Sequence, residues 1–325
     1  MFCARASGRL VGASAACLVF AGCARSPPSR SAETDAGEAP EATVPAASTS
    51  ASPASAPSAS ASPVDASRAC PEDMILVDGD YCTRLALTCK KSWYAKWNDK
   101  TICDEFDEPS ACVGSKVHKR FCIDTYEYPN RKGERPRVMF KFGQAQHLCA
   151  AEGKRVCTET EWTTACEGPS YKPYPYGYAR DPSICNGDRP YVEPKVVARD
   201  PRGLPIFAFA AKDDAVAKPE LERLWQGVES GTQPKCVSDY GVWDMPGNAD
   251  ELASSETPEP TSKFDNVTTG GPWLYGVRNQ CRPKIYTHDE GFAYYYLSTR
   301  CCAEPDGVPT DPRAPKQIER HQAWR

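Results

Sequence analysis

The sequence predicts an α+β domain with little regular secondary structure, stabilised by disulfide bonds. Fourteen of the seventeen cysteines lie between residues 70 and 325, and an even number favours a disulfide framework. After two short helical patterns the chain is rich in proline and glycine, so its strands are expected to be short and its loops long. The length of this part, about 256 residues, is enough for one large domain with its own core.

Residues 1–22 have the features of a lipoprotein signal peptide. Arg5 and Arg9 precede an apolar run, Leu10–Phe20, which is too short to span a bilayer. The run ends in Phe20-Ala21-Gly22-Cys23, which resembles a bacterial lipobox and implies cleavage before Cys23 and acylation of its thiol. Phe20 stands where the motif usually has Leu, so ordinary signal-peptide cleavage is the alternative.

Residues 23–69 form the predicted lipid anchor and tether. After Cys23 the segment is mainly Ala, Ser, Pro, Thr, Glu and Asp, and it contains no aromatic residue, Leu or Ile. Such a composition cannot bury enough apolar surface to fold, so a disordered spacer is expected. Ala24 after the anchor predicts the outer membrane of a Gram-negative bacterium, with the domain held in an extracytoplasmic space, the periplasm, through the membrane-bound lipid.

Charge and histidine content exclude two other classes of protein. The 39 basic and 43 acidic residues are interspersed and the net charge is −4, so no nucleic-acid-binding surface is predicted. Zinc is the alternative use of many cysteines, but the chain has four histidines and no Cys-x-x-Cys pair.

A cysteine-rich subregion, residues 70–122, opens the domain. Its six cysteines allow fifteen pairings, among which the sequence does not choose: Cys70, Cys82, Cys89, Cys103, Cys112 and Cys122. Met74–Val77 and Tyr81 indicate a strand and a turn around Asp78-Gly79-Asp80, and Phe121–Tyr128 indicates a returning strand. Cys89–Cys112 is mostly polar and is interpreted as an insertion with its own disulfides.

Two helices are predicted next. The first spans Gln144–Glu152 and ends before Gly153. The second begins with Thr158-Glu159-Thr160-Glu161, a capping box, and ends at Gly168. Cys149 and Cys166 fall on the predicted buried faces.

The segment Gly241–Glu251, GVWDMPGNADE, is a tight turn flanked by carboxylates. Side-chain and main-chain oxygens in such a turn suit a hard cation such as Ca²⁺. A turn rich in Asp and Asn that binds nothing is the alternative, since the spacing is not that of an EF-hand.

Five motifs in order resemble the formylglycine-generating enzyme (sulfatase-modifying factor) family over roughly residues 70–302. The turn resembles Gly-Leu-Tyr-Asp-Met-x-Gly-Asn-x-x-Glu-Trp, and Gly153–Trp162 resembles Gly-Lys-Arg-Leu-Pro-Thr-Glu-x-Glu-Trp. Tyr174–Gly177 resembles Phe-Pro-Trp-Gly, Gly270–Trp273 resembles Gly-Gly-Ser-Trp, and Thr299-Arg300-Cys301 resembles Gly-Phe-Arg-Cys. The resemblance implies an irregular fold related to C-type lectins.

The resemblance also implies metal ligands. Structural Ca²⁺ would be bound by the side chains of Asp244 and Glu251 and the carbonyls of Gly247 and Ala249. Asn186 is the candidate for a second site. The family's oxidase binds Cu(I) through two cysteines, but Tyr275 stands at the first position and only Cys281, displaced by one residue, is near the second. Copper is therefore not expected, and Cys281 is a weak catalytic candidate.

By the same resemblance, Cys149 pairs with Cys301 and Cys166 with Cys281. Cys157 and Cys302 are adjacent to the first pair in sequence and are expected to form a second bridge, which leaves Cys185 for Cys236.

Two functions stay open. One is a non-catalytic, membrane-tethered domain whose cleft binds a protein, peptide or glycan, and the other is an oxidative protein-modifying metalloenzyme with a non-standard site. An aromatic cluster near the C-terminus lines the cleft in the first interpretation or fills a core in the alternative: Trp273, Tyr286, Tyr294, Tyr295 and Tyr296.

Overall fold

A computed structural model describes residues 69–311 except 97–98, 200, 204, 208–214, 216, 257–262 and 277. The predicted signal peptide, Cys23 and the tether up to residue 68 lie outside the described residues. The chain divides into Met1–Ser60 and Ala61–Arg325, and every described residue belongs to the second unit.

The fold is an irregular, disulfide-rich α+β structure, as the sequence predicts. The described residues form three helices and many short strands, in this order: β1 (Met74–Cys82), β2 (Leu85–Ala86), β3 (Cys89–Ala95), β4 (Lys100–Phe106), β5 (Ala111–Cys112), β6 (Lys116–Asp124), α1 (Phe142–Ala151), β7 (Arg155–Val156), α2 (Glu159–Glu167), β8 (Val196–Arg199), β9 (Pro205–Phe207), α3 (Lys218–Leu224), β10 (Asp250–Ser254), β11 (Asn266–Thr269), β12 (Lys284–Ile285), β13 (Leu297–Thr299) and β14 (Cys301–Ala303). Across this part of the chain, no helix has the length and apolar character needed to cross a bilayer.

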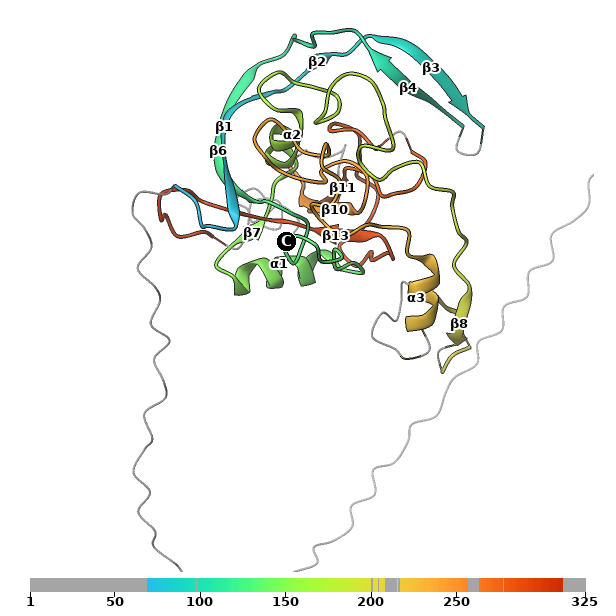
Figure 1. Ribbon diagram of the computed structural model, residues 1–325. Helices are drawn as coiled ribbons and strands as arrows, with labels where there is room; N and C mark the ends of the chain where they lie inside the picture. Colours follow the sequence, from blue (N-terminus) through green and yellow to red (C-terminus); the bar gives the residue numbers. More distant parts are fainter. Residues whose placement is uncertain are drawn as a thin grey trace, which may run out of the picture. The chain divides into compact units, whose positions relative to one another are not determined.

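The first sheet has the strand order β1-β6-β14-β7. β1 and β6 pair antiparallel along their whole length, from Met74 opposite Asp124 to Cys82 opposite Lys116 (Figure 1). The prediction of a turn at Asp78-Gly79-Asp80 is wrong, because these residues stay extended and continue to pair with β6. Gly79 serves packing instead, since a Cβ there would lie 2.1 Å from the Tyr240 hydroxyl.

The second sheet has the order β12-β11-β10-β13, with β10 antiparallel to β11 and parallel to β13. All five residues of β10 are buried although the strand begins with Asp250 and Glu251. The last two residues of the turn Gly241–Glu251 are the first two of β10, so this sheet fixes the position of the turn.

Both predicted helices are present, each shifted by one or two residues. At the start of α2, Thr158 N–H donates to Glu161 Oε2 at 2.8 Å and Glu161 N–H donates to Thr158 Oγ1 at 3.4 Å, which is the expected capping box. α2 buries Trp162 and Cys166 against β1 and β6, and α1 buries Cys149 against the second sheet.

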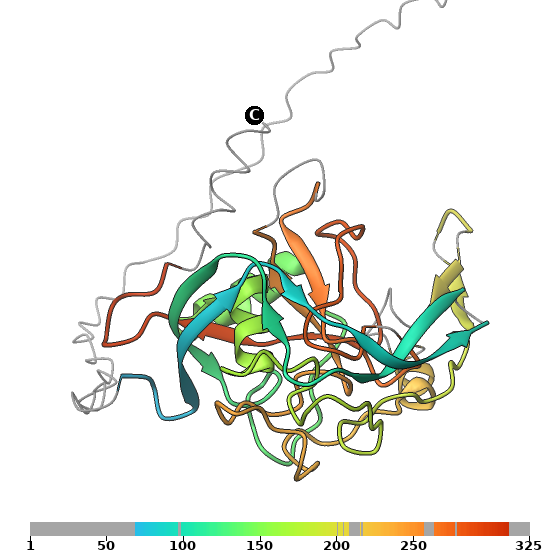
Figure 2. The same ribbon diagram turned by 90° about the horizontal axis from the view of Figure 1, so that it is seen from above.

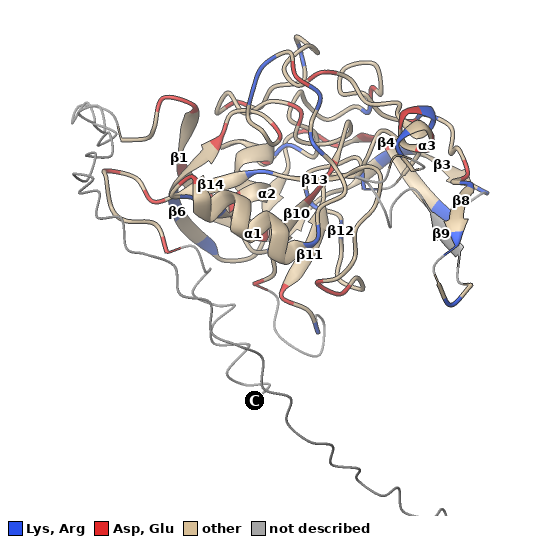
Figure 3. Ribbon diagram, turned by 90° about the horizontal axis from the view of Figure 1, so that it is seen from below, with Lys and Arg blue, Asp and Glu red and all other residues tan. Residues whose placement is uncertain are grey.

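The β3–β4 hairpin projects from the end of the β1–β6 ladder that lies away from α1 (Figures 1 and 2). Cys89–Cys103 joins its two strands, Cys82–Cys112 closes its base, and Cys70–Cys122 ties the start of the domain to β6. Lys, Arg, Asp and Glu are interspersed over the described chain, without a large region of one sign (Figure 3).

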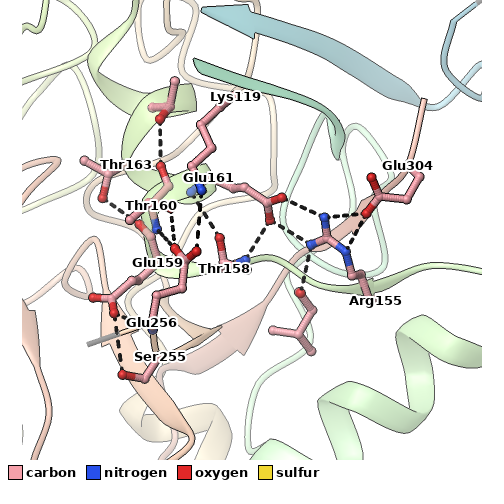
Figure 4. A network of polar contacts seen from close by, with 12 residues as sticks. Lys119, Arg155, Thr158, Glu159, Thr160, Glu161, Thr163, Ser255, Glu256 and Glu304 are labelled. Carbon is pink, nitrogen blue, oxygen red and sulfur yellow. Dashed lines mark hydrogen bonds and ion pairs between the residues drawn. The ribbon is translucent and has the colours of Figure 1, made fainter. Parts of the chain in front are cut away.

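A buried ion pair reinforces the α2 capping box (Figure 4). Arg155 donates to both oxygens of Glu161, at 2.7 and 2.6 Å, and also donates to Glu304 at 2.9 Å. Burial alone would raise the pKa of Glu161, but the charge and hydrogen bonds of Arg155 outweigh it, so the pKa lies below its ordinary value. Glu161 therefore stabilises the fold as an anion.

Replacing Glu161 with Gln is expected to lower the free energy of unfolding by about 1.5–3 kcal/mol at pH 7, because the buried Arg155 charge keeps only the partly exposed Glu304 as its ionic partner. The stabilisation by Glu161 is full above its unfolded pKa and is lost as pH falls through its lower folded pKa. The difference in free energy of unfolding between wild type and variant, measured by urea unfolding, should therefore become smaller below about pH 4.5. Glu105→Gln, in an exposed pair with Lys90, serves as the control and should leave stability unchanged at both pH values. An equal difference at pH 7 and pH 3 would contradict this account.

Candidate metal-binding turn and apolar cleft

The turn Gly241–Glu251 has an unusual backbone that the sequence accommodates. Asp244, Gly247 and Asn248 all have positive φ, at 58°, 83° and 51°. Asp, Asn and Gly tolerate this region best. A Cβ at Gly247 would lie 2.8 Å from the carbonyl oxygen of Cys185, so only glycine fits there.

Glu127, a residue that sequence reasoning missed, holds the turn in place. Its fully buried carboxylate accepts hydrogen bonds from Asn248 Nδ2 at 2.8 Å, Ala249 N–H at 3.0 Å and Ser230 Oγ at 2.7 Å. Asn248 Oδ1 in turn accepts from Val228 N–H at 2.8 Å. Because Ala249 carries a predicted metal-ligand carbonyl, Glu127 fixes the peptide next to that ligand.

The carboxylates around the turn outnumber their cations. Glu251 accepts from Arg300 Nε and Nη2, each at 2.7 Å, and from Trp162 Nε1 at 2.9 Å. Asp244 Oδ2 accepts only the Gly231 N–H, at 2.6 Å. Burial raises the pKa of Asp244 to about 6, and burial together with the charges of Asp244 and Glu251 raises the pKa of Glu127 well above its ordinary value.

This charge imbalance fits a divalent cation. Glu127, Asp244 and Glu251 face one guanidinium, that of Arg300, so two negative charges remain when all three carboxylates are ionised. Asp244 Oδ1 makes no hydrogen bond within the described residues, and all the implied ligands are oxygens, which Ca²⁺ prefers. Asp244 and the carbonyls of Gly247 and Ala249 are the groups that would hold the ion, and Glu251 would have to share its carboxylate between the ion and Arg300.

Two further observations limit this site. Among the described residues, no three His, Cys, Asp or Glu side chains form a group that could hold a metal ion, so backbone carbonyls would have to contribute. Asn186 lies against the turn, donating to Asn248 Oδ1 at 3.1 Å, while its own Oδ1 accepts from Arg189 Nε at 3.1 Å. A cation at that oxygen would meet the Arg189 charge, so the environment of Asn186 does not favour a second site.

All fourteen cysteines in the described part of the chain are disulfide-bonded. Cys149 is bonded to Cys301, Cys157 to Cys302, Cys166 to Cys281 and Cys185 to Cys236, which are the four pairs expected from the sequence. Cys281, the weak catalytic candidate, is fully buried in its bridge to Cys166. The described residues therefore offer no thiolate for a soft metal.

An apolar cleft of about 920 Å³ lies beside the segment 272–285. Its lining combines tyrosines, prolines and aliphatic residues: Tyr191, Tyr275, Tyr296, Pro190, Pro272, Pro283, Leu274 and Ile285. Tyr275, at the position that carries the first copper cysteine in the resembling family, is 41% exposed. This size and lining are typical of ligand-binding clefts.

The aromatic cluster near the C-terminus is divided between cleft and core. Tyr296 lines the apolar cleft, whereas Trp273 and Tyr295 are buried together in a core cluster. Tyr286 lines a second, polar cleft of about 470 Å³, where its hydroxyl donates to Glu159 Oε2 at 2.7 Å. Lys284 lines both clefts, and it was not among the residues that the sequence singled out.

The polar cleft surrounds the start of α2. Glu256 accepts from Thr160 N–H at 3.1 Å and from Lys119 Nζ at 3.4 Å (Figure 4). Lys284 Nζ donates to Thr163 Oγ1 at 2.6 Å, and burial lowers the pKa of its amine to about 8. Basic and acidic groups alternate on the walls of this cleft and largely neutralise one another.

Comparisons with known proteins agree with this architecture. Residues 104–295 match the family model described as sulfatase-modifying factor enzyme 1-like domain. Similar solved structures include CarF, at 14% identity and a TM-score of 0.44 over 72% of this chain and 98% of that chain. PvdO from Pseudomonas aeruginosa has 14% identity and a TM-score of 0.41 over 72% and 96% of the two chains. Treponema denticola variable protein 1 has 12% identity and a TM-score of 0.40 over 70% and 99%. No curated protein matches the chain.

Proposed function

Since the chain belongs to the family of sulfatase-modifying factor enzyme 1-like domains, we propose that it is a non-catalytic member that binds a protein, peptide or glycan in its apolar cleft. The observation that supports this proposal most is the combination of an apolar cleft with a tyrosine at the copper-ligand position. It keeps the volume and the apolar lining of a ligand site, while Tyr275 stands where the oxidase needs a thiolate.

The second candidate, an oxidative metalloenzyme, needs a soft-metal site that the described residues do not supply. Cys281 is the cysteine closest in sequence to the copper position, and its sulfur is consumed in the bridge to Cys166. A bridge between cysteines separated by 115 positions in the sequence is a stabilising structural element, worth on the order of 4–5 kcal/mol in the chain-entropy model. We therefore assign Cys281 to the fold.

The proposal also includes a bound calcium ion and a lipid anchor. Ca²⁺ binds at the Gly241–Glu251 turn, where it offsets the surplus of buried carboxylate charge described above. Cys23 carries a lipid that anchors the domain to the outer membrane, with residues 24–69 as the spacer. The motivation for the anchor is the Phe20–Cys23 motif followed by the Ala/Ser/Pro-rich segment.

Binding in the cleft can be tested with the neutral dye phenylnaphthylamine, whose fluorescence rises in apolar sites. The double replacement Tyr191→Ser and Tyr275→Ser should weaken binding about tenfold, a loss of about 1.4 kcal/mol, because both side chains line the cleft. Tyr94→Ser is the matched control, since Tyr94 is 55% exposed on β3 and does not line the cleft.

The wild-type protein should convert no cysteine of a cysteine-containing peptide into formylglycine during incubation with Cu(I) and O₂, as followed by mass spectrometry after reduction of disulfides. Conversion of that cysteine into formylglycine would establish the enzyme alternative. Dye binding that is insensitive to the double replacement would remove the cleft as the binding site.

Ca²⁺ binding is expected to raise the melting temperature. Binding to the native state alone stabilises by roughly 2.7 kcal/mol at a hundredfold excess of free ion over Kd. Excess chelator should reverse the gain, and Asp244→Asn should abolish the response, whereas Asp107→Asn, an exposed carboxylate after β4, should retain it. A melting temperature that ignores both calcium and chelator would eliminate the site.

Replacing Cys23 with Ser should release the protein from membranes, because the acylated thiol is the proposed anchor. Sedimentation of membranes from producing cells measures the effect. Cys17→Ser, which lies inside the predicted signal peptide, is the control and should still sediment. A Cys23→Ser protein that stays acylated and membrane-bound would disprove this anchor.

A further inference from the structure

The charges on the lining of the apolar cleft are all of one sign. Three cationic residues line it, Lys100, Arg278 and Lys284, and no Asp or Glu is among the thirteen lining residues. The neighbouring polar cleft differs, since Glu159 and Glu256 oppose its basic residues. The apolar cleft therefore presents a hydrophobic surface with a positive potential, which favours an anionic ligand.

Two of the three cations have capacity left for a ligand, whereas Lys284 Nζ already donates to Thr163 Oγ1 and to the carbonyl oxygen of Arg282. Lys100 makes no ion pair within the described residues, while its neighbours on the same hairpin do, Lys90 with Glu105 at 2.8 Å and Lys91 with Asp104 at 4.0 Å. Arg278 uses only Nη1 for Asp250, at 2.8 Å to each carboxylate oxygen. Its Nε and Nη2 have no partner in the described part of the chain and are free to donate.

Lys100 is the first residue of β4 in the β3–β4 hairpin, and it lies four residues before the stretch 104–295 that matches the family model. The hairpin is nonetheless fixed to the domain body. Arg180 N–H donates to Asp104 O at 2.7 Å, Phe106 N–H donates to Tyr178 O at 3.0 Å, and Cys89–Cys103 cross-links the strands. The hairpin, fixed in this way to the domain body, thus brings a cation to the cleft.

We infer that the cleft binds an acidic, extended segment of a partner polypeptide, with its carboxylates on Lys100 and Arg278 and its apolar side chains against Tyr275, Leu274 and Ile285. This inference rests on the proposed function and specifies its ligand. Grooves lined by proline and tyrosine suit extended segments in the polyproline II conformation, in which every third side chain points the same way. A glycan would need a denser set of hydrogen-bonding groups, and the one amide on the lining, Asn279, already donates to Pro272 O at 2.7 Å.

The test uses three hexapeptide libraries and the immobilised full-length protein. The first and fourth positions are Glu in one library, Gln in the second and Lys in the third, and the other positions are mixtures of Leu, Ile, Pro, Tyr and Phe. Mass spectrometry of the retained fraction should show the Glu library held at least about tenfold more than the Gln library, and the Lys library least. The preference should shrink as salt is raised, because the added contacts are ionic and partly exposed.

Two variants locate the effect. Lys100→Gln should reduce the preference for Glu over Gln while leaving retention of the Gln library unchanged. Lys90→Gln, on the same hairpin but off the cleft and paired with Glu105, should leave the preference intact.

The outcomes separate this inference from the proposed function. Equal retention of all three libraries would overturn the acidic ligand but leave a binding cleft, whereas retention of none, together with loss of dye binding, would overturn both. Retention of an acidic oligosaccharide such as trigalacturonate, with none of the peptides held, would show that the occupant is a glycan and would overturn a polypeptide partner.

Discussion

The buried pair between Arg300 and Glu251 is the interaction on which most of the described structure depends. Arg300 sits between β13 and β14, which belong to different sheets, and its side chain is fully buried. Its guanidinium binds both oxygens of Glu251 and donates to the backbone carbonyls of Asp124 and Trp243. One side chain therefore connects both sheets with the start of the turn. A buried charge of this kind is tolerated only because each donor has a partner.

The surroundings of this pair explain why the fold holds with so little regular structure. Cys301 and Cys302 follow Arg300 directly, and their bridges reach α1 and the segment before α2. Trp162 of α2 donates to the same Glu251 carboxylate. Helices, sheets and disulfides thus meet around one ion pair, and the loops that form the two clefts extend from this fixed centre.

Local signals in the sequence predicted the local parts of this structure well. The α2 capping box and the glycine stop after α1 follow from short motifs, whereas the long-range disulfides were expected from the resemblance to the family and not from local patterns. The continuous β1 strand was missed because Asp78-Gly79-Asp80 has the composition of a turn, and only pairing with β6 shows that it is extended. Glu127 and Lys100 were missed because their roles depend on contacts across the fold, with Asn248 and with the cleft, that no local pattern records.

The disulfide arrangement has a consequence for biosynthesis. The three bridges of residues 70–122 are closed within that segment, so they can form as soon as it has been made. Cys149, Cys157 and Cys166 instead have partners 152, 145 and 115 residues further on. Oxidation in order of emergence would join these neighbours to each other before Cys281, Cys301 and Cys302 exist. Native pairing of these three cysteines therefore requires that they stay reduced, or exchange partners, until the C-terminal cysteines have been made.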